Sequence, residues 1–189
     1  IVHSLCVVIS VYCMRDDIIS FLNNMDIIAK LNINESMLFY LFASLIIFSW
    51  LWLINLFNFM DGMDGLTCIQ VLLLAILTNL LSVFGLLSEN LQHLSLVLIS
   101  LFLAFFKFNR PPAKIFLGDV GSIPVGFITG LILIKTLLNN GPFIPIIIVL
   151  MFYFFDSTIT LFIRLIKKKK NMQAHSDHFY QKILRAGQT

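Results

Sequence analysis

Residues 37–59, MLFYLFASLIIFSWLWLINLFNF, form an apolar run that contains no charged side chain. A helix needs about 20 mostly apolar residues to cross ~30 Å of hydrocarbon, and this run meets that length. Four further runs come close to it, at 66–88, 91–107, 120–138 and 143–163, and another at 1–14 is apolar but too short. The runs lack the alternation of barrel strands, and other backbone in lipid must close its hydrogen bonds within helices. The sequence therefore predicts an all-α fold, a polytopic transmembrane helix bundle with five complete spans and a partial first span.

The composition excludes most other classes of protein. Hydrophobic residues make up 59% of the 189 residues and charged residues 12%, whereas a soluble domain carries about 25% charged residues. The mean hydropathy is +0.93. The three cysteines lie in apolar segments and match no metal-binding spacing, so we expect them to be packing thiols. A soluble globule, a disordered chain and a secreted disulfide scaffold are therefore excluded.

Basic residues collect on one side of the predicted bundle. Of the thirteen Lys and Arg residues, ten lie near the links 60–65 and 108–119 or at and beyond the end of the last span. They are Lys107, Arg110, Lys114, Arg164, Lys167, Lys168, Lys169, Lys170, Lys182 and Arg185. The opposite links, 15–36, 89–90 and 139–142, contain or adjoin Arg15, Lys30 and Lys135. Cytoplasmic loops of membrane proteins are enriched in Lys and Arg. We therefore predict a multi-pass protein of the plasma (inner) membrane, with the first set of links in the cytosol.

The first polar motif lies at the predicted cytosolic end of the first complete span and reads NLFNFMDGMDGL, residues 55–66. Asn55, Asn58, Asp61 and Asp64 follow one another at three-residue steps, which places them along one helix face. Asp and Asn oxygens suit a hard cation such as Mg²⁺, and the adjacent glycines let a phosphate-bearing ligand approach the backbone. A polar helix cap would explain one Asp, but not two together with two Asn.

The second motif reads FNRPPAKIFLGDVGS, residues 108–122. Its two prolines break the preceding helix, and Arg110 and Lys114 add positive charge to the link. Asp119 falls in the first turn of the next span, where free N–H groups attract anions. The alternative interpretation is that Asp119 only caps this helix.

The third motif, AHSDHFYQ at residues 174–181, lies in the tail. His175 and His178 are spaced to share a helix face, as metal ligands or as contacts of a diphosphate. The chain accordingly divides into two parts. Residues 1–166 form the transmembrane bundle, with candidate catalytic loops at 58–66 and 108–122. Residues 167–189 form a basic cytosolic tail that carries the His motif.

The three motifs occur in one order and all on the predicted cytosolic side. In this the chain resembles the polyprenyl-phosphate N-acetylhexosamine-1-phosphate transferase family, glycosyltransferase family 4. The family includes the phospho-MurNAc-pentapeptide transferase and the undecaprenyl-phosphate GlcNAc-1-phosphate transferase. The resemblance covers nearly the whole chain, and the closing His-x-x-His-x-Tyr-Gln is more similar to the GlcNAc-type branch. It implies that a sugar-1-phosphate moves from a UDP-sugar to undecaprenyl or another polyprenyl phosphate, with release of UMP, in cell-wall, lipopolysaccharide or other envelope polysaccharide synthesis.

The resemblance also implies catalytic and metal-binding roles. Asp119 matches a carboxylate associated with Mg²⁺, for which Mn²⁺ is an alternative. Asp61 and Asp64 match the acidic pair near the nucleotide and the metal. His175 and His178 match histidines near the diphosphate and the sugar. We therefore expect these five residues to be catalytic, with Asp119 and Asp61 as the metal ligands.

Four further positions are implied to bind substrate. Asn58 accompanies the acidic pair, and Asn109 and Phe116 match positions that line a uridine pocket. Lys114 lies between these two, close enough to assist a phosphate. Asp156 lies inside the last span, where ionisable groups are costly, and it matches an Asp that is structural or functional. The implied partners are UDP-N-acetylhexosamine, a polyprenyl phosphate lipid and the membrane, with no nucleic acid, and a homodimer is left open.

The sequence departs from the family pattern in two places. Ser176 stands where the family usually has Arg. The family's Asp-Asp pair at the cytosolic end of an earlier helix has no counterpart, because Asp16 and Asp17 lie at the predicted outer end of the first segment. We therefore expect the chain to be the C-terminal part of a longer protein that begins before Ile1. Two alternatives remain open, an inactive C-terminal remnant of such an enzyme and a cation-coupled transporter that uses Asp156.

Overall fold

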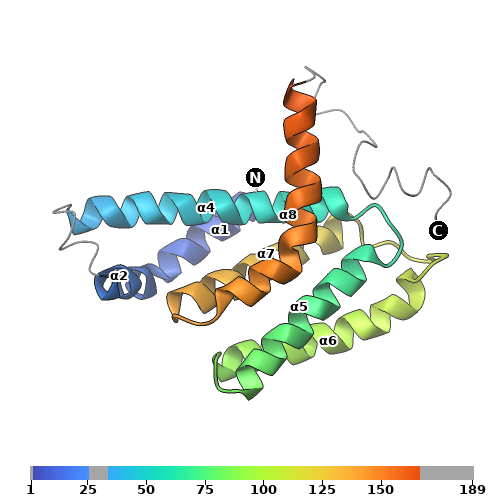
Figure 1. Cartoon of the computed structure of the whole chain (residues 1–189), viewed down its shortest axis with the longest axis horizontal. Coiled ribbons are helices and arrows are strands. Elements are labelled where there is room, and N and C mark those ends of the chain that lie inside the picture. The colour runs from blue at the N-terminus through green and yellow to red at the C-terminus, as the bar shows by residue number, and fades with distance from the viewer. Residues whose placement is uncertain (1, 26–33, 167–189) are drawn as a thin grey trace.

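The computed structural model describes residues 2–25 and 34–166, apart from the side chains of 161, 162, 164 and 165. Its regular elements are seven helices within these residues (Figure 1). They are α1 (Val2–Cys13), α2 (Arg15–Asn24), α4 (Glu35–Met60), α5 (Leu66–Val83), α6 (Glu89–Asn109), α7 (Gly118–Leu138) and α8 (Phe143–Ile166). The described part of the chain is therefore all-helical.

Five of these helices are long and apolar enough to cross a membrane, namely α4, α5, α6, α7 and the Phe143–Thr160 part of α8. The shorter α1 is apolar over 12 residues. The predicted bundle of five complete spans and one partial span is confirmed. One boundary differs, since α5 was expected to reach residue 88 and ends at Val83. Gly85 adopts the left-handed region with φ 71° and donates to Ser82 O, while Leu86 donates to Leu81 O, which terminates the helix in a Schellman motif.

The link predicted for residues 15–36 contains a helix that the sequence did not reveal. Ile18, Phe21 and Leu22 of α2 are buried on one face, whereas Asp16 and Asp17 are exposed in its first turn. This spacing gives a short amphipathic helix with an apolar stripe against the bundle. It is too short and too polar to register as a span, which is why it was assigned to the link.

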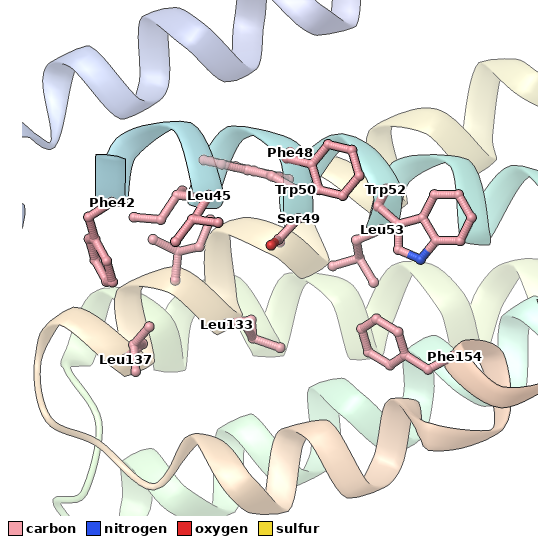
Figure 2. A pocket seen from close by; sticks show the side chains of 13 residues that line it. Phe42, Leu45, Phe48, Ser49, Trp50, Trp52, Leu53, Leu133, Leu137 and Phe154 are labelled. Carbon is pink, nitrogen blue, oxygen red and sulfur yellow. The ribbon is translucent and has the colours of Figure 1, made fainter. Parts of the chain in front are cut away.

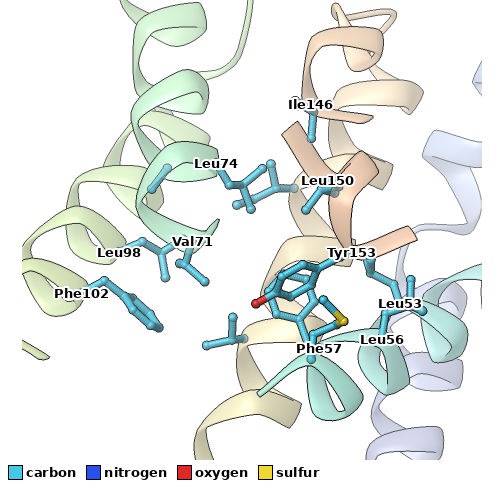
Figure 3. Close-up of a cluster of buried hydrophobic side chains, with 14 of the residues drawn as sticks. Leu53, Leu56, Phe57, Val71, Leu74, Leu98, Phe102, Ile146, Leu150 and Tyr153 are labelled. Atoms are coloured by element: carbon cyan, nitrogen blue, oxygen red, sulfur yellow. The ribbon is translucent and has the colours of Figure 1, made fainter. Parts of the chain in front are cut away.

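The bundle is built mainly from two helix pairs, α5 with α6 and α4 with α7 (Figure 1). Side chains from α4, α5, α6 and α8 meet in one buried apolar cluster, in which Tyr153 of α8 lies beside Phe57 of α4 (Figure 3). The α4–α7 pair approaches closely because Gly126 leaves room for backbone, and an added Cβ would stand 2.8 Å from Ile54 Cα. Trp50 Nε1 donates to Phe127 O across this contact at 2.9 Å.

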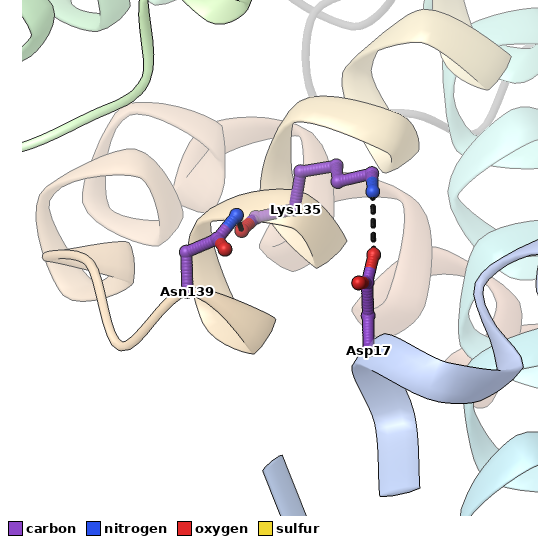
Figure 4. Close-up of polar contacts among 3 residues, drawn as sticks. All are labelled: Asp17, Lys135 and Asn139. Atoms are coloured by element: carbon purple, nitrogen blue, oxygen red, sulfur yellow. Dashed lines mark hydrogen bonds and ion pairs between the residues drawn. The ribbon is translucent and has the colours of Figure 1, made fainter. Parts of the chain in front are cut away.

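At one end of the bundle, an ion pair joins α2 to α7. Lys135 Nζ of α7 lies 2.7 Å from Asp17 Oδ2 of α2, and Asn139 donates to Lys135 O one turn later (Figure 4). The contact of Lys135 with Asp17 is the one ion pair between side chains that the structure describes. Both polar motifs that the structure describes lie at the opposite end, where α4 and α6 finish and α5 and α7 begin (Figure 1).

Candidate functional site

Two links far apart in the sequence lie against each other at this end of the bundle. Asp61 Oδ2 accepts a hydrogen bond from Gly118 N at 3.0 Å. Asp64 Oδ2 accepts one from Ala113 N at 2.8 Å. The acidic pair of the first motif is therefore bound to the backbone of the second motif, across more than 45 residues of sequence.

Asn109, the last residue of α6, ties the two links together. It is 5% exposed, and its Oδ1 accepts from Gly65 N at 3.0 Å. Its Nδ2 donates to Ile115 O, also at 3.0 Å. Both polar atoms of the side chain therefore make a contact within the protein, which leaves the second N–H of Nδ2 and the second lone pair of Oδ1 for the predicted contact of Asn109 with uridine.

Asn58, which lies one helical turn before Asp61 on α4, makes the next contact between the two motifs. Its Oδ1 accepts a hydrogen bond from Ser122 Oγ at 2.9 Å, and Ser122 is fully buried. Asn55, which the sequence placed on the same face, instead donates to Leu51 O within its own helix. The structure thus brings Asn58, Asp61 and Asp64 to the second motif but does not bring Asn55 to it.

Two glycines of the motifs occupy backbone conformations that other residues avoid. Gly65 has φ 75° and Gly118 has φ 61°. A Cβ at Gly65 would stand 3.2 Å from the ring of Phe106, in tight contact. These glycines are required by the turns into α5 and α7, which present Gly65 N and Gly118 N to Asn109 and Asp61.

The carboxylates of Asp61 and Asp119 interact at this site. Burial raises the pKa of the Asp61 carboxyl above its usual value, and the nearby negative charge of Asp119 adds to this. Hydrogen bonds from the Thr67 side chain and from Gly118 N act in the opposite direction and lower the pKa. A half-buried carboxylate beside a second one is an environment in which a bound cation would relieve both desolvation and repulsion.

The carboxylates of Asp61 and Asp119 fit Mg²⁺ if the substrate completes the coordination of the ion. In the described part of the chain, no group of three or more His, Cys, Asp or Glu side chains could hold a metal ion by itself. Mg²⁺ is commonly bound by one or two carboxylates together with substrate phosphates and water. Asp61 and Asp119 are the two carboxylates that interact, and Asp119 is exposed.

A basic pocket flanks the second link. Lys107, Arg110 and Lys114 line a volume of about 300 Å³ together with Phe108, Pro111 and Pro112. None of the three cations forms an ion pair with a residue in 2–25 or 34–166. The Phe116 side chain on the same link is 70% exposed. The link therefore presents positive charge and an open aromatic ring.

An apolar pocket lies further from this end, between α4, α7 and α8, and it opens at the surface of the bundle, where Leu45 and Phe48 are exposed. Its volume is about 370 Å³. Figure 2 shows Phe42, Leu45 and Leu53 of α4 on one side and Leu133 and Leu137 of α7 on the other. Phe154 of α8 closes one end.

The model of a known family, Glycosyl transferase family 4, matches residues 1–137 of this sequence. The chain belongs to this family. Both motifs that meet in the structure lie within the matched residues. The predicted resemblance is confirmed at this level.

Three bacterial relatives of the family 4 chain carry the name phospho-N-acetylmuramoyl-pentapeptide-transferase. The protein from Streptococcus agalactiae serotype Ia is 32% identical over 87 residues, which are 46% of this chain and 26% of that protein. The protein from Wolbachia pipientis wMel is 37% identical over 83 residues, 43% of this chain and 26% of its own. The protein from Clostridium perfringens is 33% identical over 117 residues, 59% of this chain and 32% of its own. The matched part thus spans about a quarter to a third of these relatives, and no solved structure shows significant similarity to the chain.

The remaining predicted positions of the family 4 chain lie in its C-terminal part. His175 and His178 lie outside the described residues. Asp156 is 3% exposed inside α8, and its Oδ1 accepts from Thr160 Oγ1 at 3.3 Å, one turn further along the same helix.

Sequence reasoning missed Thr67, although it directly follows the first motif. The Thr67 hydroxyl interacts with the Asp61 carboxylate and also accepts a hydrogen bond from Tyr153 of α8. The proximity of Thr67 to the Asp-Gly-Leu string was a usable signal. No sequence signal links Tyr153 to this site, because its contact crosses 86 residues.

Proposed function

We propose that this chain carries the catalytic site of a phosphoglycosyltransferase that transfers N-acetylhexosamine-1-phosphate from a UDP-sugar to a polyprenyl phosphate and releases UMP. Membership of Glycosyl transferase family 4 supports this class of reaction. The observation that carries the proposal is the contact between the two motifs, in which Asp61 binds Gly118 N at 3.0 Å and Asp64 binds Ala113 N at 2.8 Å. The product would feed envelope polysaccharide synthesis.

The chemistry of this transfer asks mainly for positioning and neutralisation of charge. The acceptor phosphate, with a second pKa of about 6, is largely ionised at neutral pH and needs no strong base. Asp61 and Asp119 would hold Mg²⁺, which when bound screens the diphosphate and stabilises the departing UMP. Lys114 would attract the phosphates, and the exposed ring of Phe116 would pack against uracil.

The apolar pocket supports a lipid acceptor. It is lined by side chains of α4, α7 and α8, with Ser49 as its one polar side chain apart from the two tryptophans. A polyprenyl chain is purely hydrocarbon, so a pocket of this character inside the span region suits it, while the phosphate reaches the polar end of the bundle. The three cations of the basic pocket support a cytosolic position for that end.

Two donors are candidates for the same chemistry. The named relatives point to the UDP-linked N-acetylmuramoyl-pentapeptide. The His-x-x-His-x-Tyr-Gln string favours UDP-GlcNAc. We propose UDP-GlcNAc, and parallel assays with both donors separate the two.

The test is Mg²⁺-dependent exchange of labelled UMP with unlabelled donor, using membranes that contain the protein expressed from its complete coding sequence. Asp119→Asn should abolish the exchange, because it removes one of the two interacting carboxylates. Asp16→Asn, an exposed carboxylate in α2 at the other end of the bundle, is the matched control and should retain it. Retained exchange in Asp119→Asn would contradict the metal assignment, and absence of exchange with every UDP-sugar would contradict the proposed reaction.

A further inference from the structure

The basic pocket lies beside the candidate site but includes none of its carboxylates. All of its lining residues fall within 107–114, at the end of α6 and in the link that follows, and its volume is about 300 Å³. Asp61, Asp64 and Asp119 are not among them. Of the residues that line the pocket, Lys114 alone was also assigned to the phosphates of the donor. The proposed reaction therefore leaves most of this pocket without a role.

Hydrogen bonds of the backbone give the pocket its shape. Phe108 O accepts from Lys114 N at 2.8 Å and from Ile115 N at 3.4 Å, which closes the link into a loop. Arg110 N donates to Phe106 O at 2.9 Å, so Arg110 continues directly from the last turn of α6. The walls of the pocket are thus held in place, while the side chains of Arg110 and Lys114 are exposed.

The pocket concentrates positive charge. Lys107, Arg110 and Lys114 all line it, and none of them forms an ion pair with a side chain that the structure describes. Three cations around one pocket repel each other, and a phosphate group that accepts hydrogen bonds from them relieves this repulsion. An arginine side chain can in addition bind two phosphate oxygens at once. The chemistry of the pocket therefore favours a phosphate or phosphodiester anion.

The position of the pocket favours a lipid as the source of that phosphate. Lys107 and Phe108 belong to α6, which is long and apolar enough to cross a membrane and which packs mainly against α5. Leu103 and Leu96 lie one and three turns before Lys107 on the same face of α6, and both are exposed. Leu101, two turns before Phe108, is exposed as well. An exposed apolar surface therefore runs along the span and ends at the pocket, as the acyl chains and headgroup of a phospholipid require.

We propose that Lys107 and Arg110, with Lys114 at the border of the pocket, bind the phosphodiester headgroup of an anionic phospholipid whose acyl chains lie along the exposed face of α6. Basic pockets at the cytoplasmic ends of transmembrane helices bind headgroups of this kind. The bound headgroup neutralises the repulsion among the three cations and so stabilises the link, without taking part in the transfer reaction. The inference does not depend on the proposed function, because it needs neither a donor nor a metal.

The first experiment measures lipid binding to the purified full chain by native mass spectrometry, with phosphatidylglycerol as the anionic probe and phosphatidylcholine as the zwitterionic one. Phosphatidylglycerol should bind more tightly. Lys107→Gln and Arg110→Gln should each raise its dissociation constant by roughly 5-fold, and together by about 30-fold, the effect expected of one and of two cations near an anionic lipid. The control, matched in charge, combines Arg15→Gln with Lys135→Gln at the other end of the bundle and should leave the affinity unchanged.

The second experiment separates a lipid from a soluble anion. Phosphatidylglycerol should raise the melting temperature of the delipidated protein, because a ligand of the folded state stabilises it, and inorganic phosphate should not. The rise should be lost when Lys107→Gln and Arg110→Gln are combined. Each variant is first melted without lipid, and if the combined variant is unfolded, the two single variants decide. An equal rise with inorganic phosphate would overturn the lipid assignment, and an undiminished rise in the variants would overturn the pocket.

The third experiment locates the lipid. A phosphatidylglycerol with a photoreactive group near the start of one acyl chain should label the exposed face of α6 between Leu96 and Phe108. The variants that combine Lys107→Gln with Arg110→Gln should lose this label. Labelling confined to the basic run Lys167–Lys170, or to helices other than α6, would overturn the proposal.

Discussion

Removal of the Asn109 side chain should separate the two links of the site. In Asn109→Ala, Gly65 N loses its acceptor in a buried position, which costs about 1–3 kcal/mol. Ile115 is exposed, so its carbonyl can turn to water, and loss of that bond costs about 0.5–1.5 kcal/mol. The expected total is about 1.5–4.5 kcal/mol, which is roughly 3–18 °C in melting temperature for a chain of this size.

The assay is thermal unfolding of the purified protein, followed by titration with UMP. Asn139→Ala is the matched control, because Asn139 also donates to a backbone carbonyl, at 2.8 Å, but is exposed. It should cost less than about 0.5 kcal/mol. Asn109→Ala should also weaken UMP binding, since the links that carry Asp64 and Phe116 are no longer tied. Equal melting temperatures for the two variants would refute the structural role assigned to Asn109.

Three further outcomes follow from the same geometry. Gly65→Ala should lower stability by about 1–2 kcal/mol in thermal unfolding, because φ is 75° and the new Cβ would stand 3.2 Å from Phe106. An unchanged melting temperature would show that the turn into α5 is not constrained as described. Lys135→Met should change stability by no more than about 1 kcal/mol, because its ion pair with Asp17 is solvent-exposed, and a larger loss would mean that the pair anchors α2. Phe116→Ala should leave the melting temperature unchanged, since the ring is 70% exposed, but should weaken UMP binding in calorimetric titration. The expected loss of affinity is about 5–150-fold, from about 1–3 kcal/mol of stacking, and unaltered affinity would remove Phe116 from the nucleotide site.

The sequence was sufficient to predict the spans and the end of the bundle at which the first two motifs lie. Runs of apolar residues determine which helices cross the membrane. Successive spans alternate in direction, and this places both described motifs, which contain Asp61 and Asp119, at one end of the bundle. The amphipathic α2 was missed because its apolar residues form a narrow stripe in a polar segment. Hydropathy averaged over a window detects spans and overlooks such helices.

Pairwise contacts within the site required the structure. The family resemblance implied that Asp64 and Asn109 both lie near the nucleotide, but the partners that they have in the structure are backbone groups, which carry no signature in the residue order. The contact between Tyr153 and Thr67 joins two helices whose relative rotation is decided by packing of the whole bundle. Such contacts depend on the register of helices distant in the sequence.

Cleavage mapping with Fe²⁺ in place of Mg²⁺ tests the central claim most directly, because radicals formed at a bound metal cut only the nearest backbone. The proposed site predicts cleavage in two segments at once, near 61–65 and near 113–119, enhanced by UMP and suppressed by excess Mg²⁺. Cleavage in one of these segments alone, or near Asp16 and Asp17 at the other end of the bundle, would contradict a metal site shared between the two links.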